Sequence, residues 1–226
     1  MIYADETVAQ VLKEDGKPAT SESRMWLYAS AALLKHQVRL FKCQPDRSGK
    51  RPEAFLKSFE WVSSTSYNLL VKVMHCGCWA HARRKWREAM PDGATVKTSK
   101  AAVGFQYCNK LFAEERRCAV YKAKKFRQNE VPISNNLVEN VIRPFSLGRK
   151  NRLFCDTAKC AEVSAIVYSL VESAKTNGVE PFAYLQHVLQ QLPYLGKPHS
   201  HEELESLIPW VPYIQQEFST KIPTPI

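Results

Sequence analysis

Acidic residues are missing from one long stretch of this chain, since no aspartate or glutamate occurs between Glu60 and Glu88. Long apolar runs are missing as well, and no stretch approaches the roughly 18 uninterrupted apolar residues of a membrane span. The first ten residues, MIYADETVAQ, lack the basic-then-apolar layout of a signal peptide. We therefore expect a protein of the cytoplasm that has no membrane partner.

Cysteine is too scarce and too irregular to form a disulfide framework. The chain of 226 residues has seven cysteines, an odd number, and they are scattered along it. Secreted disulfide scaffolds are short and have paired cysteines, so we expect reduced thiols. The apolar content of 45% is enough for a sizeable core. Internal repeats and low-complexity segments are absent too, which leaves one globular domain or two small ones.

Basic residues, in contrast, are abundant and unevenly distributed. Lysine and arginine outnumber aspartate and glutamate by 32 to 22, yet residues 177–226 hold only two lysines against five glutamates. The positive charge is gathered in three runs with interleaved aromatic residues: His81–Arg87, Arg116–Arg127 and Arg143–Arg152. Such runs favour a polyanionic partner, because lysine and arginine release counterions from phosphates. A solvated basic surface is the alternative.

The residue pattern predicts strands first and helices later, which indicates an α/β fold with a mixed sheet flanked by helices. Short β-branched and aromatic segments predict a three-strand meander at residues 2–12, 24–30 and 37–43. Further elements are a helix at 51–59, strands at 60–64 and 70–76, helices at 79–90 and, with a break, 97–127, and a short helix opened by Asn135 and Asn136.

Two helices are expected near the C-terminus. The first has an apolar stripe that should face a core and ends at Asn177-Gly178. Its members are Val163, Ile166, Val167, Leu170, Val171 and Ala174. The second helix begins at Pro181 and carries an apolar side formed by Phe182, Leu185, Leu189 and Leu192.

Four ordered blocks of residues resemble the signature blocks of bacterial transposases of the insertion sequence family numbered sixty-six. They are YADET at 3–7, GCWAHARRK at 77–85, ISNNLVE at 133–139 and RPFSLGRKN at 143–151. The resemblance runs from residue 2 to about residue 213. It implies a ribonuclease-H-like core at 1–155, with a helical segment at 156–226 that packs on it. It also implies an Asp, Asp, Glu triad that holds two divalent metals. An enzyme with this site joins transposon ends to target DNA. The protein would be bacterial and associated with the nucleoid.

The resemblance assigns Asp5 and Glu139 as catalytic residues and as ligands of Mg²⁺ or Mn²⁺. Strand transfer is an in-line displacement at phosphorus, and two metals held by carboxylates stabilise its attacking and leaving oxygens. Each residue also has a structural interpretation. Asp5 can be an ordinary strand carboxylate. Glu139 can close a capping box with Asn136 and pair with Arg143, four residues further on.

The second aspartate of the family has no counterpart here. Phe59–Thr65 (FEWVSST) resembles the strand before this aspartate and Ser66–Asn68 the segment after it, so about four residues, including the acid, are missing. The family's helical region is also much longer than the stretch between Phe112 and Ile133, and its N-terminal segment is absent. We therefore expect a truncated or degenerate copy that carries out no strand transfer.

The same blocks supply the expected DNA contacts. Arg83, Arg84 and Lys85 would form a basic helix face, and Arg143 follows at the start of the fourth block. Arg149, Lys150 and Asn151 follow a glycine and resemble a phosphate-contacting loop. Simple solvation of these side chains is the alternative for each group.

A zinc site is a further candidate. His75, Cys76, Cys78 and His81 form an H-C-x-C-x-x-H pattern with enough soft ligands for zinc. The pattern lacks the paired spacing of a known zinc finger, and Cys76 and Cys78 would point to opposite sides of a strand.

Three functions remain open on the sequence alone. The first is DNA transposition by an impaired enzyme that acts on transposon ends and target DNA, alone or as a homo-oligomer. The second is a non-catalytic DNA-binding remnant that interferes with an intact transposase by mixed assembly. The third is a product without function.

Overall fold

The computed structural model describes residues 2–31, 34–48, 50–56, 78–125, 134–196 and 200–220. Packing divides the chain into two compact units, and each unit is built from two separate stretches of sequence. The first unit comprises Met1–Ala4 and Ser48–Asn140, and the second comprises Asp5–Arg47 and Val141–Ile226. No helix among the described residues is long and apolar enough to cross a membrane.

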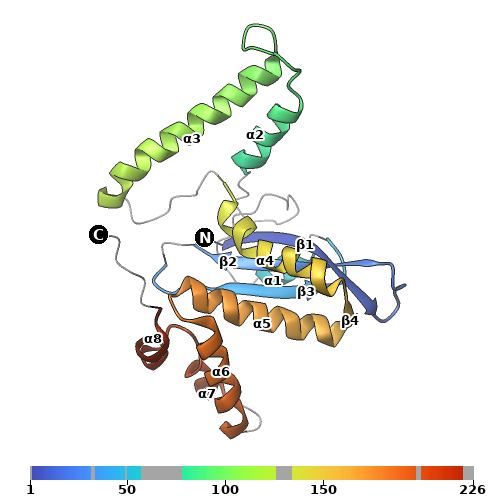
Figure 1. Cartoon of the computed structure of the whole chain (residues 1–226), viewed down its shortest axis with the longest axis vertical. Helices are drawn as coiled ribbons and strands as arrows, with labels where there is room; N and C mark the ends of the chain where they lie inside the picture. Colours follow the sequence, from blue (N-terminus) through green and yellow to red (C-terminus); the bar gives the residue numbers. More distant parts are fainter. Residues whose placement is uncertain are drawn as a thin grey trace. The chain divides into compact units, whose positions relative to one another are not determined.

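A four-stranded mixed sheet forms the centre of the second unit (Figure 1). The strands are β1 (Ile2–Lys13), β2 (Glu22–Ser30), β3 (Arg39–Gln44) and β4 (Cys155–Thr157), in the order β3-β2-β1-β4. β2 and β3 are antiparallel, whereas β4 is parallel to β1, with Val11 opposite Cys155. The predicted α/β class and the first three strands are confirmed. The sequence pattern does not predict β4.

β2 lies between two other strands, and its successive side chains, which point to opposite faces of the sheet, are buried. Met25, Trp26, Leu27 and Ala29 are all 0% exposed. A strand covered on both sides is apolar at successive positions instead of at alternate ones, and the sequence MWLYA follows this rule. This strand supplies the largest contribution to the core of the sheet.

Helix α4 (Asn136–Arg152) packs on β1 through the part that belongs to the second unit. The hydroxyl of Ser146 donates to Thr7 Oγ1 at 3.1 Å, and the guanidinium of Arg149 donates to the carbonyl of Val8 at 2.7 Å. The expected loop at residues 149–151 is therefore wrong, because these residues are helical. Gly148 provides the reason: a Cβ there would lie 2.9 Å from the hydroxyl of Tyr168, so glycine permits a close approach and not a turn.

Helix α5 (Ala158–Thr176) covers the outer edge of the sheet. The backbone N–H groups of Phe41 and Arg39 on β3 donate to the hydroxyls of Ser169 and Ser173, at 2.8 and 3.0 Å. Ser173 in turn donates to the carbonyl of Arg39 at 3.2 Å. Backbone groups at a sheet edge normally remain open to another strand, and here helix side chains occupy them.

Asn177 holds the end of α5 to the loop before β3. Its Nδ2 donates to the carbonyls of Gln37 and Ser173, at 2.6 and 2.7 Å, and its Oδ1 accepts from the N–H of Gln37 at 3.1 Å. Gly178 follows with φ +74°, a conformation that glycine adopts without strain. The predicted helix stop at Asn177-Gly178 is confirmed.

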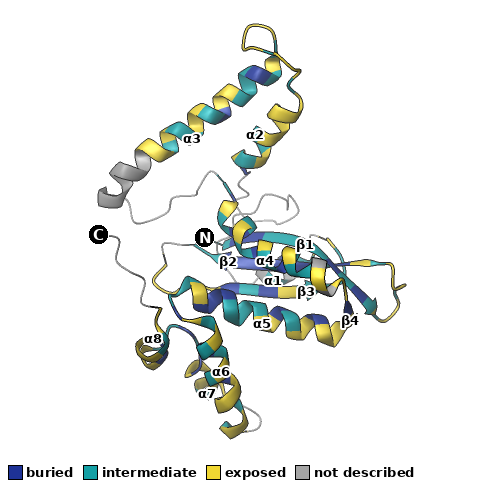
Figure 2. Ribbon diagram, in the orientation of Figure 1, coloured by how far each residue is buried: buried dark blue, intermediate teal, exposed yellow. Residues whose placement is uncertain are grey.

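The predicted core-facing stripe of α5 is wrong in part. Val163, Ile166 and Val167 are 53%, 59% and 41% exposed (Figure 2). The residues that α5 buries are mostly small: Ala161, Ala165, Glu172, Ser173 and Ala174. Small residues let the helix axis approach the sheet closely enough for its serines to reach the backbone of β3, so the larger side chains point outward.

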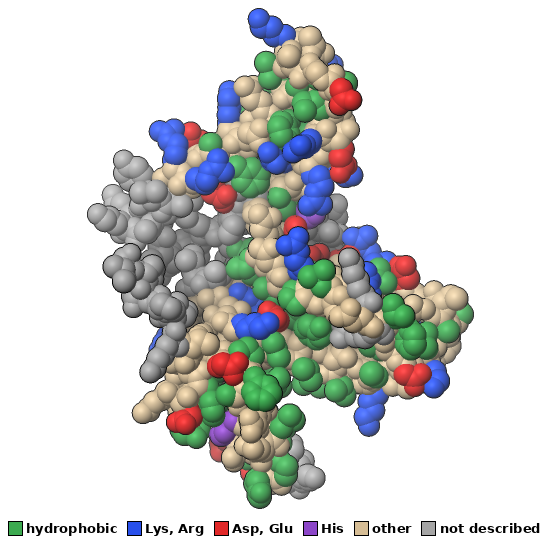
Figure 3. All heavy atoms as spheres, viewed as in Figure 1, with side chains coloured by type: hydrophobic (Ala, Val, Ile, Leu, Met, Phe, Trp, Pro, Cys, Tyr) green, Lys and Arg blue, Asp and Glu red, His purple; other side chains and the backbone are tan. Residues whose placement is uncertain are grey.

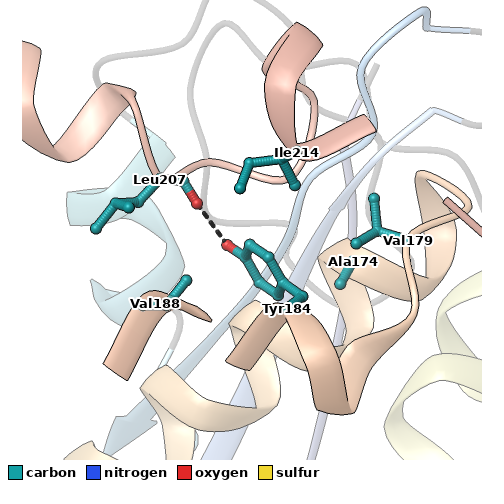
Figure 4. Packing of buried hydrophobic residues seen from close by; sticks show 6 residues of the cluster. All are labelled: Ala174, Val179, Tyr184, Val188, Leu207 and Ile214. Carbon is teal, nitrogen blue, oxygen red and sulfur yellow. Dashed lines mark hydrogen bonds between the residues drawn. The ribbon is translucent and has the colours of Figure 1, made fainter. Parts of the chain in front are cut away.

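The C-terminal helices enclose a second apolar cluster, shown in Figure 4. These helices are α6 (Pro181–Gln191), η1 (Leu192–Tyr194), α7 (His201–Glu205) and α8 (Pro212–Phe218). The buried members of the cluster are Ala174, Val179, Tyr184, Val188, Leu207 and Ile214. Helix α6 begins at Pro181 as predicted. Its predicted buried side is wrong in part, because Phe182 and Leu189 are 76% and 67% exposed, whereas Leu192 packs against the cluster.

The described helices of the first unit are α1 (Lys50–Leu56), α2 (Trp79–Glu88) and α3 (Lys100–Lys125). α2 packs against α3 where Gly104 faces the ring of Trp86. A Cβ on residue 104 would lie only 2.5 Å from this ring, so the contact requires glycine. α3 has no break within these bounds, so the expected break is wrong. The strands predicted at 60–64 and 70–76 lie outside the described residues.

We predict that Ser173→Ala destabilises the protein by about 1–3 kcal/mol, because it leaves the N–H of Arg39 buried without an acceptor. Ser164→Ala is the matched control, since among the described residues the hydroxyl of Ser164 bonds only within α5, to the carbonyl of Cys160. It should change stability by less than about 0.5 kcal/mol. Urea unfolding and hydrogen exchange of the β3 amides measure both. Equal losses for the two variants would contradict the role given to Ser173.

Tyr184 predicts a loss of stability at alkaline pH. Burial raises the pKa of its phenol to about 12, and the neutral hydroxyl donates to the carbonyl of Leu207 at 2.9 Å. The unfolded phenol ionises near its ordinary pKa of about 10. This contribution is therefore complete below pH 10 and is lost as the pH rises towards 12.

Tyr184→Phe should cost about 1 kcal/mol at pH 7 and should remove this part of the alkaline loss. Denaturant unfolding at several pH values between 7 and 12 measures the effect. Tyr194→Phe is the control, because Tyr194 is 85% exposed. If both variants lose stability in parallel with the wild type above pH 10, the assignment to Tyr184 fails.

Candidate metal centre

Cys78 and His81 lie on one side of the beginning of helix α2. Cys78 is the residue before the helix, and His81 is one helical turn further on. Residues three positions apart on a helix are neighbours on its surface. The sulfur of Cys78 is buried at 7% residue exposure, while the side chain of His81 is 50% exposed. The pair therefore offers one soft and one borderline ligand at the edge of the first unit.

Glu139 joins this pair from the first turn of α4. Its Oε1 lies 3.7 Å from Nε2 of His81. One ligand atom each from Cys78, His81 and Glu139 lie within 4.8 Å of one another. All three residues belong to the first unit. The arrangement brings together two of the residues predicted for zinc and one predicted for magnesium.

Asn135 fixes the surroundings of the sulfur. Its backbone N–H donates to Sγ of Cys78 at 3.2 Å, and its side-chain amide donates to the carbonyl of Ala4 at 3.3 Å. Asn135 is itself buried, at 7% exposure. An N–H group that points at a cysteine sulfur fixes the orientation of that sulfur, as outer-shell donors do at metal sites.

The capping-box interpretation of Glu139 finds no support in the helix start. α4 begins at Asn136, so Asn135 holds the cap position and Glu139 is the fourth helical residue, one beyond the N3 position of a capping box. Oε1 of Glu139 is shielded from water and has no hydrogen-bond partner among the described residues. This atom is therefore available to a ligand.

Asp5 lies on β1 within the second unit, and Glu139 belongs to the first. Oδ1 of Asp5 accepts from the backbone N–H of Glu6 at 2.9 Å. The neighbouring carboxylate of Glu6 is 6% exposed and pairs with Arg47. Glu6 thus has a structural partner in its own unit, and Asp5 is half-buried on the strand.

Four of the predicted DNA contacts are exposed: Arg84, Lys85, Arg143 and Asn151. Figure 3 shows lysine and arginine side chains over α2 and α3. Lys85 donates to the carboxylate of Glu88 at 2.7 Å, and this bond lowers the pKa of that carboxyl.

Two other predicted DNA contacts already have structural partners. The guanidinium of Arg83 lies 4.6 Å from the ring centre of Phe105 on α3 and donates to the side chain of Asn109. Arg149 donates to the carbonyl of Val8. The side chain of Lys150 lies outside the described residues. Arg83 and Arg149 therefore hold helices in place as well as carrying charge.

Other parts of the predicted site also fall outside the described residues. These are His75 and Cys76 of the zinc pattern and the stretch 57–77, which includes the place of the missing aspartate.

Two further features of the second unit lack the chemistry of a site. A cavity of about 370 Å³ is lined by polar groups such as Gln37, Asn177 and Gln215, which already bond to one another and to nearby backbone. Burial raises the pKa of the Cys43 thiol to about 12, so this sulfur stays neutral and unreactive at physiological pH.

Comparison with known proteins identifies the family. The sequence model described as "Transposase IS66 family" matches residues 1–130 and 124–163. The chain belongs to this family. A second model, the IS66 C-terminal element, matches residues 169–210. The expected resemblance is therefore confirmed.

Relatives of this IS66 chain occur in Sinorhizobium fredii. Uncharacterized protein y4qI is 38% identical over 274 residues, which cover 92% of this chain and 50% of y4qI. Uncharacterized protein y4jD is 32% identical over 80 residues, which cover 35% of this chain and 15% of y4jD. The chain thus spans half or less of the length of these relatives. No solved structure matches it.

Proposed function

We propose that this IS66 chain acts in transposition as a DNA-binding protein whose own strand-transfer chemistry is impaired. The observation that carries the proposal is the stretch from Glu60 to Glu88, which contains no carboxylate between its ends. The family resemblance requires its second metal-binding aspartate within this stretch. We further propose a ribonuclease-H-like core, in which Asp5 and Glu139 are the two remaining members of the triad.

Three carboxylates supply the negative charge that holds the two metal ions of such a centre. Two Mg²⁺ or Mn²⁺ ions stabilise the attacking and leaving oxygens of a phosphoryl transfer only when oxygen ligands fix both ions. Nearly all of the catalysis in such a reaction comes from positioning and charge neutralisation. Asp5 and Glu139 alone leave the metal pair short of one anionic ligand, so the rate should fall by orders of magnitude.

The comparisons support internal deletions of the kind expected. The stretch matched with y4qI covers 274 residues, more than the 226 residues of the whole chain, so y4qI has segments without a counterpart here. The family model also matches in two pieces that meet at residues 124–130. This junction falls between Phe112 and Ile133, where the family's helical region is longer.

DNA binding is supported by exposed basic side chains. Arg84 lies on α2 and Arg143 on α4, both are exposed, and each belongs to one of the basic runs. The chain carries a formal net charge of +10. Binding through phosphate contacts needs no metal and no intact triad, so it can persist in a protein that has no catalytic activity.

We predict that the protein does not join labelled ends of its own insertion sequence to target DNA in the presence of Mn²⁺. The missing ligand lowers transition-state stabilisation, and the joined product should stay at the level of a reaction without protein. An intact transposase of the family, assayed on its own ends, is the positive control. Efficient joining by this chain would refute the proposed impairment.

We also predict salt-sensitive binding to a mixed-sequence DNA duplex. Arg84→Glu and Arg143→Glu should each weaken binding. Each should also reduce the steepness of the plot of log K against log salt concentration by about one for each phosphate that the variant no longer neutralises. Fluorescence anisotropy between 50 and 200 mM salt, roughly the range over which such contacts are screened, measures this.

Lys159→Glu is the matched control, because Lys159 is exposed on α5 but lies outside the three basic runs. It makes the same change in net charge. If the three variants weaken binding equally, total charge and not the proposed contacts determines the affinity. If the wild-type protein does not bind the duplex at all, the proposed function is wrong.

A further inference from the structure

The Cys78, His81 and Glu139 cluster has the dimensions of a transition-metal site. Zinc binds nitrogen or oxygen at about 2.0–2.2 Å and sulfur at about 2.3 Å, so a nitrogen and an oxygen ligand of a tetrahedral ion lie roughly 3.3–3.6 Å apart. Nε2 of His81 and Oε1 of Glu139 are 3.7 Å apart, just beyond this separation. The sulfur lies within 4.8 Å of both, so a side-chain shift of about an ångström would complete the set.

The unbonded carboxylate oxygen points to a bound cation. Oε1 of Glu139 is shielded from water, and no described residue donates a hydrogen bond to it. A buried polar atom without a partner destabilises the fold, and a carboxylate oxygen does so more strongly.

The hydrogen bond that the sulfur of Cys78 accepts is a second, independent feature of the cluster. Cys78 is buried at the beginning of α2, where its side chain makes no capping bond to the helix. Instead, the sulfur accepts the N–H of Asn135 from a position 57 residues further along the chain. The N–H of Asn135 holds the sulfur in place near the carboxylate of Glu139. Outer-shell groups orient the thiolate ligands of metal sites in the same way.

The donor set selects the ion. Mg²⁺ and Mn²⁺ prefer ligands that are all oxygen, whereas a thiolate together with an imidazole selects zinc or a similar borderline ion. Three protein ligands leave a fourth position for water or for a further side chain. This chemistry differs from that of the two-metal centre expected of the family, and a zinc ion bound to Glu139 would take one of the two carboxylates that remain for that centre.

We propose that Cys78, His81 and Glu139 bind one Zn²⁺ ion, which fastens the beginning of α2 to the first turn of α4. The ion would close the chain segment between His81 and Glu139, which contains the α2–α3 pair. The proposal depends only on contacts within the first unit. It does not rest on the proposed function, because binding of zinc requires neither DNA nor catalysis.

The experiment measures metal content and ligand identity in the full-length protein. Purified under reducing conditions and dialysed, the chain should hold about one zinc per molecule by elemental analysis. After replacement by Co²⁺, a thiolate-to-cobalt charge-transfer band and strong visible bands should report tetrahedral ligation that includes sulfur.

Cys78→Ser should abolish the charge-transfer band, and His81→Ala and Glu139→Gln should each weaken zinc binding by more than roughly tenfold, since loss of an outer-shell partner alone costs this much. His81 is half-exposed, so His81→Ala keeps the test valid even if replacement of the buried Cys78 disturbs folding. Cys160→Ser and His201→Ala are matched controls at exposed positions outside the first unit and should retain the ion.

Two outcomes would overturn the proposal. The first is a full-length protein that binds neither zinc nor cobalt above the level of the His81→Ala variant. The second is loss of the ion in Cys76→Ser together with its retention in Glu139→Gln, which would assign the ion to the linear H-C-x-C-x-x-H pattern instead. Neither outcome bears on whether the chain binds DNA, so this test is independent of the proposed function.

Discussion

The bonds between helix α5 and the edge strand β3 determine much of the second unit. Ser169 and Ser173 accept the N–H groups that β3 would otherwise offer to another strand. These contacts require the helix to lie close to the strand, and this closeness explains why α5 turns alanine and serine inward and valine and isoleucine outward. Asn177 continues the same contact at the helix end. The cluster around Tyr184 then builds on the residues that follow, beginning with Ala174 and Val179.

The local sequence predicted those elements in which neighbouring residues all favour the same secondary structure. β2 has five successive apolar residues, so its composition alone predicted a strand. No local pattern predicts β4, because it has only three residues, Cys155–Thr157, and forms by parallel pairing with β1. Gly148 suggested a turn because a glycine in the sequence does not reveal whether it permits a bend or a close contact.

Helix faces were harder to predict than helix positions. α5 and α6 have apolar residues on more than one side, so the period of 3.6 residues selects no single face. Tyr184 and Val188, and not Phe182 and Leu189, are buried on α6 because the carbonyl of Leu207 and the side chain of Ile214 meet that side. These partners lie beyond the reach of any local pattern, since Leu207 is 23 residues from Tyr184.

The same limit applies to the candidate site. The family resemblance named Asp5 and Glu139, and the H-C-x-C-x-x-H pattern named Cys78 and His81 as possible zinc ligands. That Glu139 meets this pair could not be predicted, because the approach depends on the tertiary contact through Asn135. A sequence shows which ligands a chain possesses, whereas packing decides which of them share an ion.

The Asn177-Gly178 pair has a consequence for the ageing of the protein. Asparagine is chemically labile, and a following glycine leaves its side chain open to attack by the next backbone nitrogen. Deamidation would replace Nδ2, which donates to the carbonyls of Gln37 and Ser173, by a second carboxylate oxygen. Two donors would disappear and a negative charge would face two carbonyl oxygens. Slow hydrolysis of one amide, without any mutation, would therefore loosen the end of α5 from the loop before β3.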